Sequence, residues 1–300
     1  IVQLSKKCKP APFFVGNAFK DAYNRAASMI NLCYCGNAKI LPGLLLSLLS
    51  LRETSVEPLT VYLLTADLSF LNKDYEPIRE KSRAYLEEVL QEKNKDSQVV
   101  LLDETQRFYP LFQDSPNLKT PYTPYSMLRL IFDLEMALPS HLLYLDTDAI
   151  ALKDISPLYH LDLGACDRAM ALDAVYSKLF DAHYCNSGVI LFDLEKVRRD
   201  GLLEEGRALL NEKKYTMPDQ EAFNRIGRER IFFLPRIYNE QREIFPDTVI
   251  RHYCQQVRPL PVMHVEKAKP WDGEKYHKAY PKEPHEALLK LFEEKKKGLD

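Results

Sequence analysis

The sequence lacks the long apolar segments of a membrane protein. None of its apolar runs reaches the length of about 20 residues that a helix needs to span a bilayer. The first residues also lack the pattern of a secretory signal. We therefore expect a soluble, cytoplasmic protein.

An excess of charge of one sign is also missing. The 41 Lys and Arg residues nearly balance the 43 Asp and Glu residues, which leaves a net charge of −2. This balance does not favour nucleic acid or an anionic membrane as a partner. The one local exception is a Lys-rich run, Glu293 to Lys297, which is typical of a solvated helix face and indicates at most a peripheral membrane contact.

A dense set of cysteines is absent as well. The six cysteines are Cys8, Cys33, Cys35, Cys166, Cys185 and Cys254. This spread excludes a disulfide framework, so we expect reduced thiols. Cys33 and Cys35 have no second close Cys or His pair that would complete a zinc site, and we interpret them as small core residues.

Apolar strands and amphipathic helices alternate in the first half of the chain. The predicted strands are Asn31 to Cys35, Leu59 to Thr65 and Gln98 to Leu102, and the predicted helices are Ile40 to Leu51 and Glu76 to Asn94. Such alternation indicates βαβ units with a mostly parallel sheet, hence an α/β fold. The sequence contains neither an internal repeat nor a low-complexity linker.

The second half contains shorter strands, so we expect the sheet to become mixed there. Predicted elements are a helix from Thr123 to Ala137, strands at Leu142 to Leu145, Ala169 to Asp173, Gly188 to Phe192 and Ile231 to Leu234, a helix from Leu194 to Lys213, and a helix that Met217 and Pro218 open. We expect one domain over residues 29–275, an amino-terminal extension over 1–28 and a helical tail over 276–300.

Two carboxylates follow the apolar strand Leu142 to Leu145. Asp146 and Asp148 are separated only by Thr147. Ligands of open α/β sheets bind beyond the carboxyl ends of the strands, where two acids are well placed to hold a hard divalent cation. The alternative is a simple turn, with one of the acids capping the next element.

Two further positions have both a ligand-binding and a structural interpretation. Gly36 and Asn37, after the first strand, allow the backbone to approach a ligand, or they form a tight connection. Arg129 shares a helix face with Tyr125 and can reach a phosphate at the strand ends, or it forms an exposed salt bridge.

Four motifs occur together in a fixed order. They are Asp146-Thr147-Asp148, Asn186-Ser187-Gly188, Pro218-Asp219-Gln220, and His264 followed by Lys269-Pro270-Trp271. From Asn31 to Trp271 the chain thus resembles the family 8 glycosyltransferases, retaining enzymes of the GT-A fold that use a nucleotide sugar and a divalent metal. The resemblance implies a Rossmann-like, mostly parallel sheet.

The resemblance implies that Asp146, Asp148 and His264 hold Mn²⁺ or Mg²⁺, and mixed imidazole and carboxylate ligands suit Mn²⁺ somewhat better. The alternative for His264 is a hydrogen-bonded histidine near the core. Lys269 resembles the family's lysine on the diphosphate. The family usually has a Gly between this His and Lys, which is missing here, so Lys267 is a rival for the contact.

The resemblance also implies a nucleotide-sugar site and a reactive face. The residues implied for the nucleotide sugar are Cys35, Gly36, Asn37, Arg129, Asp146, Thr147, Asp173, Asn186, Ser187 and Lys269. Asp219 and Gln220 match the acid and amide at the reactive face, or they only form a helix cap, for which Asp219 is suited. Gln220 is a poor nucleophile, so we favour front-face attack, with Gln220 supporting an oxocarbenium-like centre.

The resemblance implies transfer of a hexose to a carbohydrate or other hydroxyl acceptor in cell-surface polysaccharide synthesis. It favours UDP-glucose or UDP-galactose as the donor. A haloacid-dehalogenase-like phosphatase would instead use Asp146 as nucleophile and Asp148 as acid/base, but Ala149-Ile150 does not match its usual Gly-Thr. The other alternative is a sugar-nucleotide-binding protein without turnover.

Overall fold

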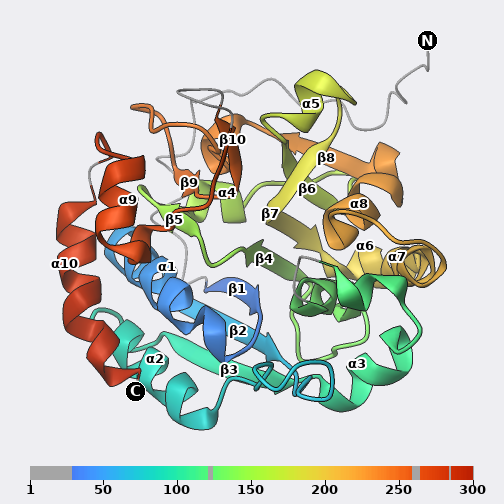
Figure 1. Cartoon of the computed structure of the whole chain (residues 1–300), viewed down its shortest axis with the longest axis horizontal. Coiled ribbons are helices and arrows are strands. Elements are labelled where there is room, and N and C mark those ends of the chain that lie inside the picture. Colours follow the sequence, from blue (N-terminus) through green and yellow to red (C-terminus); the bar gives the residue numbers. More distant parts are fainter. Residues whose placement is uncertain (1–28, 121–123, 259–263, 284, 300) are drawn as a thin grey trace.

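The computed structural model describes residues 29–120, 124–258, 264–283 and 285–299. A seven-stranded sheet with the order β3-β2-β1-β4-β7-β6-β8 runs through its centre (Figure 1). In chain order these strands are β1 (Ile30–Cys35), β2 (Leu59–Thr65), β3 (Gln98–Asp103), β4 (His141–Leu145), β6 (Arg168–Leu172), β7 (Cys185–Asp193) and β8 (Ile231–Leu234).

The sheet is parallel in its first half and mixed in its second. β3, β2, β1 and β4 run parallel to one another, whereas β7 lies antiparallel to both β4 and β6, and β8 is parallel to β6. Strands buried on both faces have nearly continuous apolar sequences, which is why these strands could be predicted. The expected mostly parallel sheet that becomes mixed is confirmed.

Two small antiparallel sheets accompany the large one. β5 (Ala149–Ala151), which follows β4 closely, pairs with β9 (Ile250–His252). β10 (Gln256–Arg258) pairs with β11 (His264–Glu266).

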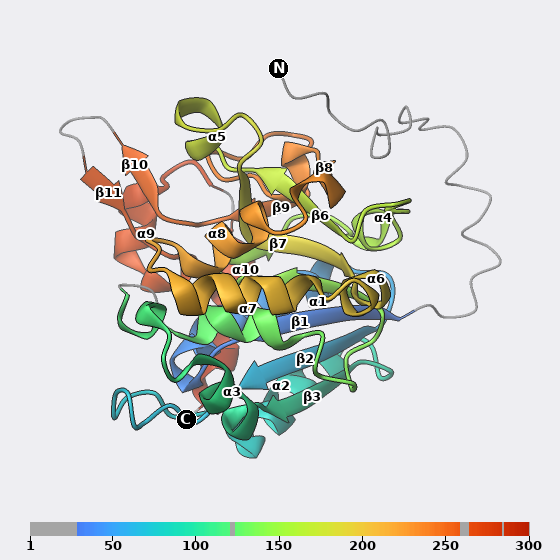
Figure 2. The same ribbon diagram turned by 90° about the vertical axis from the view of Figure 1, so that its right-hand side faces the viewer.

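Helices cover both faces of the large sheet (Figures 1 and 2). One face carries α1 (Leu41–Thr54), α2 (Glu80–Gln91) and α10 (Glu286–Lys295). The other carries α3 (Thr105–Phe112), the 3₁₀ helix η4 (Pro124–Ile131), α6 (Leu194–Arg199), α7 (Leu202–Glu212) and α8 (Pro218–Arg225). The shorter helices are α4 (Ser156–Tyr159), α5 (Tyr176–Leu179) and α9 (Glu274–Ala279).

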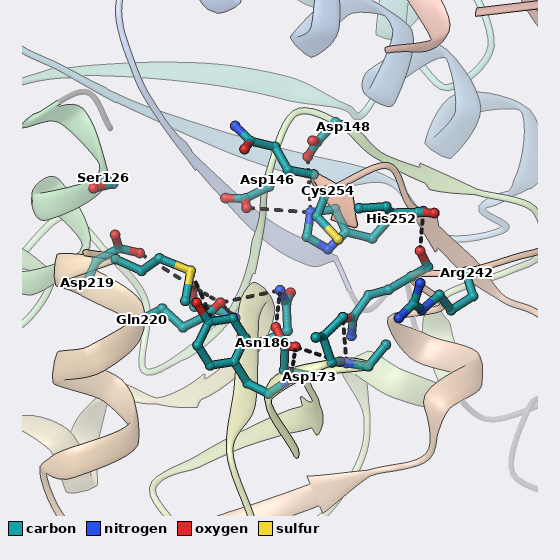
Figure 3. A pocket seen from close by; sticks show the side chains of 18 of the residues that line it. Ser126, Asp146, Asp148, Asp173, Asn186, Asp219, Gln220, Arg242, His252 and Cys254 are labelled. Atoms are coloured by element: carbon teal, nitrogen blue, oxygen red, sulfur yellow. Dashed lines mark hydrogen bonds and ion pairs between the residues drawn. The ribbon is translucent and has the colours of Figure 1, made fainter. Parts of the chain in front are cut away.

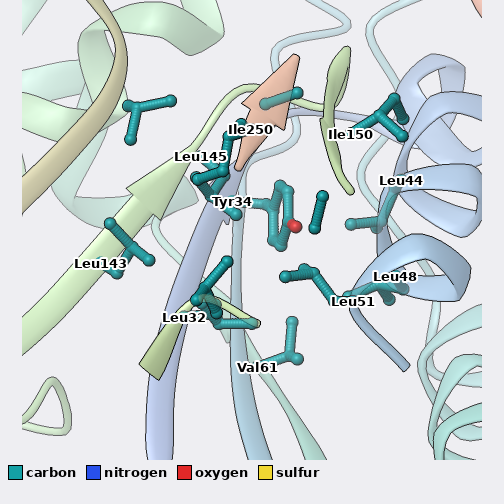
Figure 4. Close-up of a cluster of buried hydrophobic side chains, with 14 of the residues drawn as sticks. Leu32, Tyr34, Leu44, Leu48, Leu51, Val61, Leu143, Leu145, Ile150 and Ile250 are labelled. Atoms are coloured by element: carbon teal, nitrogen blue, oxygen red, sulfur yellow. The ribbon is translucent and has the colours of Figure 1, made fainter. Parts of the chain in front are cut away.

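The larger core lies between the sheet and α1 (Figure 4). Leu32 of β1 and Leu143 of β4 are register partners and are fully buried there. Almost all of α1 is buried, because α2, α10 and the indole of Trp271 pack around it. Trp271 lies so close to Gly43 of α1 that a Cβ at that position would overlap the ring. Trp271 thus packs against α1 and the larger core.

Two predicted helices differ from the observed ones. The helix predicted from Leu194 to Lys213 is divided into α6 and α7 by Gly201, whose φ of +64° is left-handed. A residue with a Cβ is strained at that φ, so glycine permits the break. The helix predicted from Thr123 to Ala137 is observed as the shorter 3₁₀ helix η4, and Thr123 lies outside the described residues.

Described residues after position 275 pack into the same core as α1. Tyr276 and Tyr280 of the α9 region and Phe292 of α10 are all buried in it. The extension expected over residues 1–28 lies outside the described residues, and the division into domain and tail stays a prediction. Across the described ranges, every helix is too short or too polar to cross a membrane.

Candidate active site

The acidic pair lies directly beyond the end of β4. The backbone N–H of Asp146 donates to the carbonyl of Gly188 in β7 at 2.8 Å, which continues the strand pairing by one residue. The chain then turns, and the N–H of Ala149 donates back to the Asp146 carbonyl at 3.0 Å. Asp148 sits within this turn, so both side chains are held at one corner of the sheet.

The pairing of β5 with β9 brings His252 to the two carboxylates. His252 is the register partner of Ala149, the residue after Asp148. Its Nε2 lies 3.2 Å from Asp148 Oδ1 and 3.6 Å from Asp146 Oδ2 (Figure 3). One ligand atom from each of the three residues lies within 4.8 Å of the others. This is an arrangement of two oxygen donors and one nitrogen donor around a common point.

Lys269 carries a positive charge into the same corner. Its ammonium forms an ion pair with Asp148 and donates to the carbonyl of Tyr253 at 2.6 Å. Burial alone would lower the pKa of Lys269, but the neighbouring Asp148 carboxylate outweighs burial and raises it. Burial would likewise raise the pKa of Asp148, but Lys269 and His252 hold it well below its usual range. Asp148 is therefore a carboxylate and Lys269 an ammonium.

A second charged pair lies on the other side of the acidic corner. Arg129 of η4 is buried and forms an ion pair with Asp219 of α8. Its guanidinium also donates to the Ser187 carbonyl, and its Cζ lies 4.5 Å from the centroid of the Tyr144 ring. Its Nη1 is 3.8 Å from Asp146 Oδ1. Arg129 thus links α8 to the acidic corner.

The amide of Gln220 is held in one orientation. Its Oε1 accepts from the backbone N–H of Ser187 at 3.1 Å and from Asn186 Nδ2 at 3.3 Å. The backbone N–H can only donate, so the atom facing it must be the carbonyl oxygen. Its Nε2 lies 3.6 Å from the sulfur of Met217. The Gln220 side chain is therefore preorganised against the start of β7.

Asp173 follows β6 and has a local structural role as well. Its Oδ1 accepts from the backbone N–H groups of Val175 and Tyr176, both at 2.9 Å. Its Oδ2 lies 3.4 Å from Asn186 Nδ2. The first contacts order the turn into α5, and the last directs the carboxylate toward Asn186.

These groups line one cavity of about 480 Å³ (Figure 3). A volume of this size is typical of small-molecule and cofactor sites. Its walls carry carboxylates, amides and basic side chains from β4, β7, α8 and the segment around β9. The cavity can hold a polar, anionic ligand with a cation at its acidic corner.

A model of the family described as "Glycosyl transferase family 8" matches residues 31–275. The chain belongs to this family. The match covers β1 to the start of α9 and so includes every element that contributes to the cavity.

Two curated relatives resemble parts of this family 8 chain. The lipopolysaccharide 1,2-glucosyltransferase of Escherichia coli (strain K12) is 37% identical over 110 residues, 33% of this chain and 32% of that protein. General stress protein A of Bacillus subtilis (strain 168) is 27% identical over 193 residues, 58% of this chain and 66% of that protein. The matched segment thus spans about a third of the first relative and about two thirds of the second.

Solved structures show the fold of the family 8 chain. The galactosyltransferase LgtC, in complex with donor and acceptor sugar analogs, superposes with a TM-score of 0.63 at 18% identity, covering 89% of this chain and 96% of that one. The glycosyltransferase GlyE of Streptococcus pneumoniae TIGR4 gives 0.55 at 17% identity, covering 89% and 64%. The chain has the GT-A fold.

The structure brings together most of the residues that the sequence nominated. The nominated residues that line the cavity are Arg129, Asp146, Asp148, Asp173, Asn186, Ser187, Asp219, Gln220 and Lys269. Those that do not line it are Cys35, Gly36, Asn37 and Thr147. Asn37 is buried, and its side chain donates to the Asp74 carbonyl at 3.3 Å. The contact predicted between these four residues and the nucleotide stays a prediction.

Several alternatives raised by the sequence can now be compared with the geometry. Arg129 is buried, so its interpretation as an exposed salt-bridging residue is wrong. Met217 is the N-cap of α8, and the Asp219 carboxylate pairs with Arg129, so the prediction that Asp219 caps this helix is also wrong. Lys267 is exposed, whereas Lys269 lines the cavity.

His252 is the main residue that sequence reasoning missed. It lies in the short buried strand β9, in a segment where no strand is predicted from the sequence. A polar imidazole within such a buried run was the available signal. His264, nominated in its place, lies in β11, and its side chain is outside the described residues, so its metal role stays untested.

Proposed function

We propose that this protein is an active glycosyltransferase that moves a sugar from a nucleoside diphosphate to a hydroxyl acceptor. The observation that carries the proposal is that one cavity joins the Asp146, Asp148 and His252 group to Asp219 and Gln220. Such a transfer needs a cation-binding group at the leaving diphosphate and a polar group at the sugar. Both are adjacent here.

Asp146, Asp148 and His252 fit a divalent cation in their chemistry. Two carboxylates and an imidazole suit Mn²⁺ somewhat better than Mg²⁺, and the three side chains converge. We assign to His252 the ligand role that the sequence suggested for His264. A cation bound there would act as a Lewis acid that stabilises the departing diphosphate.

Lys269 and Arg129 supply the remaining positive charge. Lys269 already forms an ion pair with Asp148, so its ammonium is positioned beside the proposed cation site to bind a diphosphate oxygen. Arg129 is held between Asp219 and the Ser187 carbonyl and keeps the Asp219 carboxylate in place. The Asp219 and Asp173 carboxylates are then available to accept hydrogen bonds from sugar hydroxyls, and the Asn186 amide can donate one.

The transfer proceeds with retention of configuration through front-face attack in this proposal. Gln220 is an amide and therefore a poor nucleophile, but its orientation is fixed by Ser187 and Asn186. A preorganised dipole stabilises developing charge without reorganising during the reaction. Gln220 is thus placed to act on the oxocarbenium-like centre electrostatically.

We further propose UDP-glucose or UDP-galactose as donor and a carbohydrate as acceptor. The proposal draws on the similarity to proteins named as a lipopolysaccharide glucosyltransferase and a galactosyltransferase. It places the reaction in cell-surface polysaccharide synthesis. A clear preference for GDP- or CMP-sugars in a thermal-shift panel with Mn²⁺ would count against it, because a ligand of the folded state raises the melting temperature.

Calorimetry of UDP binding with and without Mn²⁺ tests the metal site. Asp148→Asn removes a charged ligand and should keep the fold but abolish the Mn²⁺-dependent part of the affinity. Asp96→Asn, at an exposed carboxylate outside the cavity, is the matched control and should bind as wild type. Unchanged Mn²⁺-dependent affinity in Asp148→Asn would exclude this acidic pair as the cation site.

The two alternative functions predict different products. A transferase hydrolyses its UDP-sugar slowly when no acceptor is present, and it releases UDP. A phosphatase would release inorganic phosphate, and a binding protein would release neither. Family membership and the GT-A fold favour the transferase over the phosphatase.

A further inference from the structure

Asn239 is a buried amide that sequence reasoning did not single out and that does not line the cavity. It follows the 3₁₀ helix η6 (Arg236–Tyr238) and is only 1% exposed. Its Oδ1 lies 2.9 Å from His252 Nδ1, and its Nδ2 lies 3.0 Å from Asn186 Oδ1. Asn239 therefore contacts the imidazole on the side opposite the two carboxylates.

The backbone fixes the orientation of both amides. The N–H of Gly188 lies 3.0 Å from the Asn186 side chain, and because a backbone N–H only donates, the atom it meets must be Oδ1. The Asn239 side chain also contacts Asn186 Oδ1, at 3.0 Å. Because this oxygen only accepts, the Asn239 atom that contacts it must be the donor Nδ2. The other end of the Asn239 amide is then its oxygen.

The same reasoning settles the proton on His252. Asn239 Oδ1 accepts only, so His252 Nδ1 must carry a hydrogen to make the 2.9 Å contact. In a neutral imidazole with hydrogen on Nδ1, the lone pair is on Nε2. That nitrogen is the one facing Asp146 and Asp148.

We propose that Asn239 is a positioning residue that fixes the Nδ1–H tautomer of His252 and so presents the Nε2 lone pair to a divalent cation. The inference rests on the ligand role proposed for His252. Histidine ligands generally donate their second ring N–H to an acceptor, which fixes both tautomer and ring orientation. Here that acceptor is a neutral amide.

The two hydrogen bonds of residue 239 suit an amide better than a carboxylate. Asp at this position would accept from His252 but would turn a second oxygen toward Asn186 Oδ1. Unlike a carboxylate, an amide accepts from His252 and donates to Asn186 at once. Both contacts are buried, where hydrogen bonds are stronger and leaving one unmade costs more.

The same hydrogen bonds reach the proposed reactive face. Asn186 uses its Nδ2 toward Gln220 Oε1 at 3.3 Å while its Oδ1 accepts from Asn239. His252, Asn239, Asn186 and Gln220 thus form one continuous series of side chains. Asn239 contributes to the cation end of this series without touching the cavity.

Mn²⁺ binding, measured by electron paramagnetic resonance without any sugar nucleotide, tests the proposal. Asn239→Leu removes the acceptor and should weaken Mn²⁺ binding by about 10- to 100-fold, the usual effect of losing a partner of a metal ligand. Asn239→Asp keeps the acceptor and should retain most of the affinity. Asn117→Leu removes an equally buried amide that bonds the Leu210 and Lys213 carbonyls, and it should leave Mn²⁺ affinity unchanged.

Nitrogen-15 correlation spectra of the wild type give a readout that does not depend on folding of the Asn239 variants. They are recorded with the diamagnetic ion Mg²⁺, above the ordinary imidazole pKa, and His252 is identified by its absence in His252→Gln. We expect hydrogen on Nδ1. Hydrogen on Nε2 would overturn the proposal.

The outcomes separate this inference from the proposed function. If the wild type binds no Mn²⁺, the proposed cation site and the role of Asn239 both fail. If the wild type binds Mn²⁺, His252→Gln does not, and a folded Asn239→Leu binds as wild type, only the role of Asn239 is overturned.

Discussion

Arg129 and Asp219 form an ion pair inside the protein. Both side chains are less than a tenth exposed, and they come from η4 and α8, elements far apart in the sequence. The Arg129 guanidinium also lies over the Tyr144 ring and 3.8 Å from Asp146. The pair therefore connects the acidic corner of the cavity to the residues proposed at the sugar.

Asp219→Asn should reduce both stability and donor affinity. Removing one partner leaves the Arg129 charge buried without its counter-ion, which typically costs about 3 to 5 kcal/mol of unfolding free energy. Donor binding should weaken as well, because a carboxylate acceptor for sugar hydroxyls is lost. Urea unfolding and calorimetry with a UDP-sugar measure the two effects.

Asp133→Asn is the matched control for this prediction. Asp133 forms a similarly buried pair with Arg207, with 2.6 Å between Oδ1 and Nη1, and neither residue lines the cavity. This variant should lose stability while keeping donor affinity. Equal loss of affinity in both variants would show that the effect of Asp219 is only structural.

Gln220→Ala should affect the chemical step more than binding. A preorganised polar group that acts on developing charge typically contributes about 10- to 1000-fold in kcat when it is removed. Donor affinity should stay nearly unchanged, because the interaction is stronger in the transition state than in the ground state. Glu221→Gln, on the same helix outside the cavity, is the control. Full kcat in Gln220→Ala would remove it from the proposed mechanism.

Gly188→Ala should weaken Mn²⁺ binding. A Cβ at Gly188 would overlap the His252 ring and lie 2.7 Å from both of its nitrogens, so the ring must leave its present position beside the carboxylates. Gly206→Ala adds a methyl group at 3.1 Å from a terminal carbon of Leu130, outside the cavity, and should leave Mn²⁺ affinity unchanged. Paramagnetic resonance measures both affinities, and identical values would contradict the packing argument.

Glu104 should make the protein less stable as pH rises. Its carboxylate is buried beside Glu135, with Arg107 Nη1 2.6 Å from Glu104 and 2.8 Å from Glu135. Burial, together with a hydrogen bond to Glu135, raises the pKa of Glu104 to about 7, from 4.5 in the unfolded chain. The protonated form is favoured in the folded state, so its contribution is complete below pH 4.5 and is lost as pH rises through 7.

Glu104→Gln should remove this decline. The pKa of Glu135 is lowered, so the stability that Glu135 contributes is lost as pH falls below 4.5. That range lies outside the pH range in which Glu104 changes stability. Chemical denaturation between pH 5 and 8 should show wild type losing roughly 1 to 3 kcal/mol more than Glu104→Gln. The exposed Glu88→Gln is the control, and it should follow wild type at every pH.

Local patterns in the sequence were sufficient to place much of the candidate site. Asp146 and Asp148 follow a buried apolar strand, and Asp219 and Gln220 follow a proline at a helix start. The adjacent residues in the sequence were therefore enough to predict where each pair lies. The parallel half of the sheet could be predicted for the same reason, because strands buried on both faces are apolar throughout.

The sequence by itself thus determined the fold class, the strands of the sheet and the residues at their ends. Only the tertiary structure decided that His252 reaches the acidic pair, because the register of β5 against β9 pairs it with Ala149. It also decided that Arg129 is buried against Asp219 and that Asn239 supports the imidazole. These relationships join residues far apart in the chain. The periodicity of side chains in the sequence indicates which face of an element a residue lies on. Which residues it contacts there depends on how distant segments pair in the folded protein.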